Sequence, residues 1–180
     1  MKNKLTNKSP LVVIARHSED ISWVGKLSYN FQVINKSAVG NTGREAASYL
    51  WFICKNYDSL EGEYIFCQAN PFDHAADFLE QIKLENRQTF GEVLACDING
   101  LPHHWGGLNV AEIAAALNLP PLERDIRFVA GSQFRVSSEQ ILTRSIDFYR
   151  NALWIANNHE AYPNAPWILE RLWLTIFNIK

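Results

Sequence analysis

The chain has 180 residues and a formal net charge of -2, and beyond its first eight residues its Lys and Arg occur singly or in isolated pairs. This balance argues against a surface that follows a nucleic-acid backbone and against one that binds a membrane through basic charge. A chain of this length is most simply one domain, which buries roughly two-thirds of the surface that its unfolded form would expose. We therefore expect no nucleic-acid partner.

The cysteines indicate a reducing compartment. Cys54, Cys67 and Cys96 are odd in number, lie in apolar stretches and form no Cys-x-x-Cys pair, as is typical of small core residues. The first apolar run, Leu11 to Ala15, is too short for an export signal or a membrane span. We expect a soluble cytoplasmic protein.

Short apolar runs predict the strands of a sheet. Residues 1–9 are polar and are expected to form a loose tail before one domain over residues 10–180. Leu11–Ala15 and Val93–Cys96 are continuous apolar runs, the pattern of strands covered on both faces. The predicted strands are 11–15, 31–34, 64–67, 93–96, 127–129 and 133–136.

Capping residues predict where several helices begin. Thr42 with Glu45 and Ser137 with Gln140 have the spacing of a capping box, in which each side chain satisfies the backbone amide of the other residue. Single caps are expected at Ser18, Asp73 and Asn109. The predicted helices follow Ser18, span 41–57, follow Asp73, and span 109–117, 139–144, 146–157 and 166–177.

Strands alternate with helices first, and helices dominate the end. This order predicts a three-layer α/β fold with a mainly parallel central sheet. Ligands bind such sheets in crevices at the carboxyl ends of the strands. The polar loop from Gln68 to His74, which follows strand 64–67, is therefore the first place where we expect a site.

Ordered strings across most of the chain, from about residue 11 to 178, resemble an uncharacterised family of small glycosyltransferase-like domains. They are Arg16-x-x-Glu19-Asp20-x-x-Trp23, Asn41-x-Gly43-Arg44-Glu45-x-x-x-Tyr49-Leu50, Gln68-x-x-Pro71-Phe72-Asp73-His74, Gly131-Ser132-Gln133-Phe134 and Glu170-Arg171-Leu172-Trp173-x-x-Ile176-Phe177. The chain is also distantly similar to the Rossmann-like A-type fold of glycosyltransferases that use nucleotide sugars. The resemblance implies sugar transfer from a nucleotide sugar to a glycan or small-molecule acceptor.

The A-type resemblance implies a polar turn after the first strand, an Asn-x-Gly segment that opens a helix, and Asp-x-Asp after the next strand. Asn41 stands in the Asn-x-Gly segment. The chain departs at the third feature, because Gln68-Ala69-Asn70 stands where Asp-x-Asp is expected, with Asp73 three residues later. Asp97-Ile98-Asn99 is an approximate match after a different strand.

The polar loop offers oxygen donors for a divalent ion. Sugar transfer needs the charge of the departing diphosphate neutralised, which Mn²⁺ or Mg²⁺ commonly does through hard oxygen ligands. Gln68 and Asn70 are neutral donors and Asp73 is a single carboxylate, so the set is poor in charge. Without a metal, the positive charge would come from Arg44, Arg16 or His74. Equally, Asp73 is a helix cap and the two amides satisfy the loop backbone.

The charged side chains near the first strand and at the start of the first long helix each have two interpretations. Glu19 and Asp20 bind ribose hydroxyls or a base edge, or they only place negative charge in a first helical turn. Arg44 and Glu45 face the crevice, where helix amides attract anions, or Glu45 closes the capping box and Arg44 pairs with an acidic neighbour.

Glu170 is the candidate general base, because the resemblance places a carboxylate of the last helix near the acceptor. A structural ion pair with Arg171 or Arg135 is the alternative. His103, His104 and Trp105 form either a lid whose indole stacks on a sugar or a plain solvent loop.

Two other functions stay open. One is a metal-dependent hydrolase assembled from side chains whose spacing matches no familiar zinc motif. Its candidate ligands are Asp73, His74, Asp97, His103 and His104. The other is a nucleotide- or glycan-binding module that kept the fold without catalysis.

Overall fold

A computed structural model describes residues 9–39, 41–104 and 107–180. Its strands are β1 (Leu11–Arg16), β2 (Phe31–Asn35), β3 (Glu63–Gln68), β4 (Val93–Cys96), β5 (Ile126–Val129) and β6 (Phe134–Ser137). Its α-helices are α1 (Arg44–Asn56), α2 (Phe78–Gln81), α3 (Val110–Ala116), α4 (Ser138–Leu142), α5 (Ile146–Asn157) and α6 (Ala165–Ile176). Short 3-10 helices are η1 (Ser22–Lys26), η2 (Lys36–Ala38), η3 (Asn41–Gly43), η4 (Tyr57–Ser59) and η5 (Pro71–Asp73).

The main sheet has four strands in the order β2-β1-β3-β6. β1 pairs in parallel with both β2 and β3, and only β6 runs antiparallel, beside β3. The expected α/β fold with a mostly parallel sheet is thus confirmed. Because β1 and β3 run in the same direction, Arg16 and Gln68 end their strands at the same edge of the sheet.

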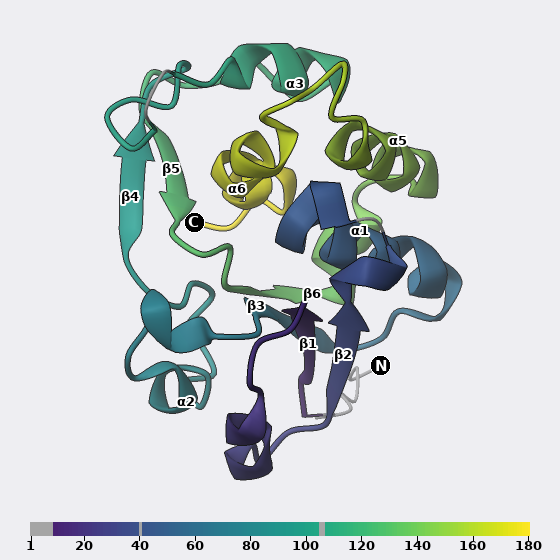
Figure 1. Ribbon diagram of the computed structural model, residues 1–180, viewed down its shortest axis with the longest axis vertical. Coiled ribbons are helices and arrows are strands. Elements are labelled where there is room, and N and C mark those ends of the chain that lie inside the picture. The colour runs from purple at the N-terminus through teal and green to yellow at the C-terminus, as the bar shows by residue number, and fades with distance from the viewer. Residues whose placement is uncertain (1–8, 40, 105–106) are drawn as a thin grey trace, which may run out of the picture.

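Both faces of the main sheet are buried at its central strands β1 and β3, as the continuous apolar run 11–15 predicted for β1. On one face Val13 and Phe66 belong to a core that includes side chains of α1, α5 and α6. On the other, Val12 and Ile65 pack with Trp23 of η1 and Phe78 of α2. Figure 1 shows α1, α5 and α6 gathered on one side of the sheet and α2 on the other.

β4 is not the fourth buried strand of this sheet. It pairs only with β5, antiparallel, in a separate two-stranded sheet at the side of the molecule (Figure 1). Ala95, in its middle, is exposed, and only Cys96 is buried. The partner strand β5 packs against α6 and connects this small sheet to the core.

Two predicted caps are present and three are not. Asn109 accepts from the Glu112 amide, and Ser137 and Gln140 form the expected capping box. No side chain caps α1, α2 or η1. The predictions for Thr42, Asp73 and Ser18 were therefore wrong.

Each of these three turns has different chemistry. α1 begins after Gly43, and Glu45 forms an ion pair with Lys36 instead of closing a box. α2 begins at Phe78, with Asp77 at its N-cap position, so Asp73 lies too early in the chain. Before η1, the amide of Ser22 donates to Asp20 rather than to Ser18.

No helix in the described part of the chain has the length and apolar character that crossing a bilayer requires.

Candidate functional site

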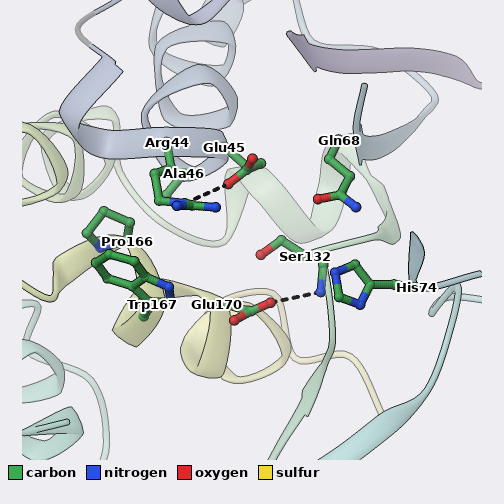
Figure 2. A pocket seen from close by; sticks show the side chains of 10 residues that line it. Arg44, Glu45, Ala46, Gln68, His74, Ser132, Pro166, Trp167 and Glu170 are labelled. Carbon is green, nitrogen blue, oxygen red and sulfur yellow. Dashed lines mark hydrogen bonds and ion pairs between the residues drawn. The ribbon is translucent and has the colours of Figure 1, made fainter. Parts of the chain in front are cut away.

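A pocket of about 210 Å³ opens at the carboxyl end of β3. Figure 2 shows its walls, which come from the start of α1, the end of β3, the turn between β5 and β6, and α6. The lining residues are Arg44, Glu45, Ala46, Gln68, His74, Gly131, Ser132, Pro166, Trp167 and Glu170. Segments far apart in the sequence meet here because α6 packs on the same sheet face as α1.

Four of the residues expected to bind or transform a ligand line this pocket together. They are Arg44, Gln68, His74 and Glu170. Glu45, expected at the crevice or in a capping box, is also in the wall. The site predicted at the end of β3 thus coincides with a cavity that is lined by both positively and negatively charged side chains.

Glu170 is held in place from two sides. Its Oε1 accepts the backbone amide of Gly131 at 2.8 Å, and its Oε2 accepts from Nη1 of Arg171. Of the two expected ion-pair partners, only Arg171 makes the contact; Arg135 instead donates to backbone carbonyls of residues 82, 84 and 85. Each carboxylate oxygen has two lone-pair positions, so Glu170 keeps acceptor capacity toward the pocket.

Arg171 is itself buried and connects α6 to a neighbouring loop. Its guanidinium donates to the carbonyl oxygens of Trp167 at 2.9 Å and His103 at 3.2 Å. The same group lies over the ring of Phe128 in β5, 4.5 Å from its centroid. The position of Glu170 is therefore coupled to the small sheet and to the loop that contains His103.

His74 is seated between two glycines. A Cβ on Gly131 would lie 2.5 Å from Cδ2 of His74, and one on Gly91 would lie 2.6 Å from its carbonyl oxygen. Both glycines have positive φ angles, 77° and 108°. Only glycine combines this backbone conformation with so close an approach. His74 is exposed on its other side, at the pocket.

Arg44 forms a wall of the pocket with Trp167. Its guanidinium lies 5.2 Å from the centroid of the indole, and its Nε lies 3.5 Å from Oε2 of Glu45. Arg44 has a φ of 49°, in the left-handed region that non-glycine residues rarely adopt. Such strain is found at sites where the surrounding structure imposes a side-chain position.

Glu45 is the acceptor of a buried lysine. Nζ of Lys36 lies 2.5 Å from its Oε1 and 3.8 Å from Oε1 of Glu19. Burial opposes the ionisation of Glu45, but the charge and hydrogen bond of Lys36 outweigh it and lower the pKa of this carboxyl. Lys36 was not expected at the site, because a single lysine after a strand has no distinctive pattern in sequence.

The polar loop after β3 is bonded within itself. Nε2 of Gln68 donates to the carbonyl of Asn70 at 2.8 Å, and Nδ2 of Asn70 donates to Oδ1 of Asp73 at 2.8 Å. Asn70 and Asp73 do not line the pocket, and Asp73 is the loop's one carboxylate. This donor set does not fit Mn²⁺ or Mg²⁺, which favour several charged oxygen ligands.

The turn after β1 is also bonded within itself. Oε2 of Glu19 accepts the amides of His17 and Ser18, and Nε of Arg16 donates to the carbonyl of Glu19. Asp20 accepts both the amide and the hydroxyl of Ser22, and these bonds lower the pKa of its carboxyl. Arg16, Glu19 and Asp20 lie outside the pocket lining, and Lys36 connects Glu19 to it through Glu45.

The histidine loop lies against α6. The ring of His104 meets Trp167 edge-on at 5.9 Å between centroids, and His103 meets Phe128 at 5.8 Å. Neither histidine lines the pocket, but His104 supports the indole that does. Trp105 lies outside the described residues, as does the side chain of Asn41.

The ligands of the hydrolase alternative are not gathered. Within residues 9–39, 41–104 and 107–180, no three His, Cys, Asp or Glu side chains are grouped as a metal site needs. Asp97 instead accepts the backbone amides of Asn99 and Leu101 in its own turn.

Ser132 and Trp167 also line the pocket and were not predicted from the sequence. Ser132 appears in one of the family-like strings, but nothing in its type distinguishes it from other loop serines. Trp167 was predicted only as a residue of the last helix, 166–177. Both residues line the pocket only because the β5–β6 turn lies against α6 in the folded protein.

Comparison with known protein families gives a match over part of the chain. Residues 11–93 match the model of a family described as a protein of unknown function (DUF3431). No curated protein and no solved structure matches the chain. The matched segment contains Arg44, Gln68 and His74, whereas Ser132 and Glu170 lie beyond it. The chain is thus similar, over this segment, to a family without an assigned activity, and the match adds nothing on glycosyltransferases.

Proposed function

We propose that this protein is a nucleotide-sugar-dependent glycosyltransferase with a Rossmann-like domain of the A type. One observation carries the proposal: a firmly positioned carboxylate, Glu170, shares a pocket with Gln68 and His74 at the carboxyl end of a parallel strand. Ligands of α/β folds bind at this edge. The order of a polar turn after β1, a helix opened by Asn41-x-Gly43 and a loop after β3 supports the A-type assignment.

The proposed reaction is a direct displacement at the anomeric carbon. Glu170 accepts the proton of the acceptor hydroxyl, whose oxygen forms a new bond to that carbon. The bond from the carbon to the diphosphate oxygen breaks, and the nucleoside diphosphate leaves with the electron pair. Glu170 can act in this way because Gly131 and Arg171 fix its orientation and leave acceptor lone pairs open.

Charge on the leaving group is stabilised by a side chain of the chain itself. His74 is exposed at the pocket, where a fixed donor can stabilise negative charge that develops in the transition state. The oxygen donors of the loop do not fit a divalent ion, so no step of the mechanism passes through a metal. His74, the exposed end of the loop that begins at Gln68, is then the side from which the diphosphate contacts the protein.

A thermal-shift panel tests the binding step. Nucleoside diphosphates and their sugars are added to the wild-type protein and to Glu170→Gln, with and without Mg²⁺ or Mn²⁺. A ligand that binds the folded state raises its stability, by about 2.7 kcal/mol at a hundred times Kd. We expect at least one nucleotide sugar to raise Tm equally in both proteins. No shift with any of them would refute the proposal.

A non-catalytic module that binds nucleotides or glycans is the second candidate. The observation that favours it is that both oxygens of Glu170 already have protein partners, Gly131 and Arg171, as in a structural ion pair. Binding of a nucleotide sugar without turnover would select this function over transfer.

A further inference from the structure

Ser132 is the unexplained residue of the pocket. It is only 6% exposed, and its hydroxyl points into the cavity (Figure 2). Within the described part of the chain no hydrogen bond holds this hydroxyl, and only the backbone amide of Ser132 is bonded, to the carbonyl of Val129. Its backbone has a φ of 55°, so a buried polar side chain is directed at the cavity from a conformation that serine rarely adopts.

The charges around the cavity are already paired. Glu45 is neutralised by Lys36 and also contacts Arg44, and Glu170 is paired with Arg171. A phosphate in the cavity would therefore meet the carboxylates of Glu45 and Glu170. The guanidinium of Arg44, at the wall, already has Glu45 as its anionic partner. These pairings disfavour a dianion inside the pocket.

What remains open in the cavity is hydrogen-bonding capacity for neutral groups. The Ser132 hydroxyl can both donate and accept, and the carboxylates of Glu45 and Glu170 keep acceptor lone pairs. The side-chain oxygen of Gln68 is also available, because its Nε2 makes the loop bond. Trp167 adds an apolar surface. The pocket thus offers hydrogen-bond acceptors for several ligand hydroxyls beside the indole of Trp167. This combination fits a ligand that is a neutral ring with many hydroxyl groups.

We propose that the pocket binds a neutral sugar ring, and that Ser132 is a binding residue for one of its hydroxyls. The cavity of about 210 Å³ is smaller than the range of roughly 300–1,000 Å³ of pockets for drug-sized ligands, which suits one ring and not a whole nucleotide. This inference rests on the proposed function in one respect: it assigns the ring to the sugar unit of the donor, with the diphosphate outside, toward His74.

Titrations followed by NMR test the class of ligand. The probes are the neutral monosaccharides glucose, galactose, mannose and N-acetylglucosamine, and the anions inorganic phosphate and pyrophosphate. The readout is the chemical shift of the backbone amides of Ala46 and Trp167, which line the pocket on the side away from His74 (Figure 2). We expect at least one sugar to shift these amides saturably at millimolar concentration, and neither anion to do so.

Ser132→Gly tests the residue. The substitution removes the hydroxyl and relieves the left-handed backbone, so the variant is expected to fold at least as stably as the wild type. Loss of one neutral hydrogen bond should weaken the sugar about three- to tenfold. Asn118→Gly is the matched control, because Asn118 has a φ of 50° and lies outside the pocket. Its sugar affinity should be unchanged.

The inference is overturned if no sugar shifts these amides, if pyrophosphate or phosphate shifts them at lower concentration than any sugar, or if Ser132→Gly binds the sugar as tightly as the control. These outcomes are separate from the fate of the proposed function. Sugar binding at Ser132 without any donor turnover would keep the inference and refute transfer. Turnover without sugar binding at these amides would do the reverse.

Discussion

His74 shows how single glycines prepare this site. Gly91 and Gly131 approach it so closely that any side chain on them would enter its ring or its carbonyl oxygen. Gly131 also donates the amide that orients Glu170. One glycine thus positions two of the predicted site residues. The sequence indicated both His74 and Glu170, but the role of Gly131 depends on a backbone angle that residue type alone does not reveal.

Gly131→Ala should be strongly destabilising. The new Cβ would lie 2.5 Å from the His74 ring at a φ of 77°. Left-handed strain and overpacking together should lower the free energy of unfolding by about 2 to 3 kcal/mol, measured by urea denaturation. Gly25→Ala is the control, since nothing lies within 4 Å of its Cβ. Equal stability of the two variants would contradict this account of Gly131.

At the scale of elements, local patterns predicted the positions of strands and helices better than the chemistry of their ends. The predicted ranges 11–15, 64–67 and 166–177 agree with β1, β3 and α6 to within one residue at each end, because hydrophobic periodicity is a local property. The Thr42–Glu45 spacing was misleading, since Lys36 of η2, which lies before the spaced pair in the chain, takes the carboxylate of Glu45 as its ion-pair partner. A buried ion pair outweighed a local cap.

Two alanine substitutions should separate a cap that forms from one that does not. Ser137 accepts the Gln140 amide at the start of α4, so Ser137→Ala should cost about 1 kcal/mol. Thr42 is exposed and caps nothing in α1, so Thr42→Ala should change stability by less than about 0.5 kcal/mol. Chemical denaturation of both variants measures the difference. A larger loss at Thr42 than at Ser137 would show that the capping box forms in solution.

At the scale of the whole molecule, the candidate site exists because α6, near the end of the chain, packs beside α1 in the first half. The segment that matches the family supplies Arg44, Gln68 and His74, and the later segment supplies Ser132 and Glu170. The edge of the sheet was predictable from the parallel topology. The pocket was not, because β4 leaves the main sheet and the β5–β6 turn takes a place beside α6 that no local pattern encodes.

The most direct test is the release of nucleoside diphosphate from nucleotide sugars by the wild-type protein and by Glu170→Gln. The exposed residue Glu160 supplies the control variant Glu160→Gln. Loss of a general base typically costs about 10² to 10⁴ in rate. We predict turnover in the wild type and in Glu160→Gln, with a decrease of at least about a hundredfold in Glu170→Gln, which still binds the donor. Equal turnover in all three proteins would contradict the assigned role of Glu170 and its pocket.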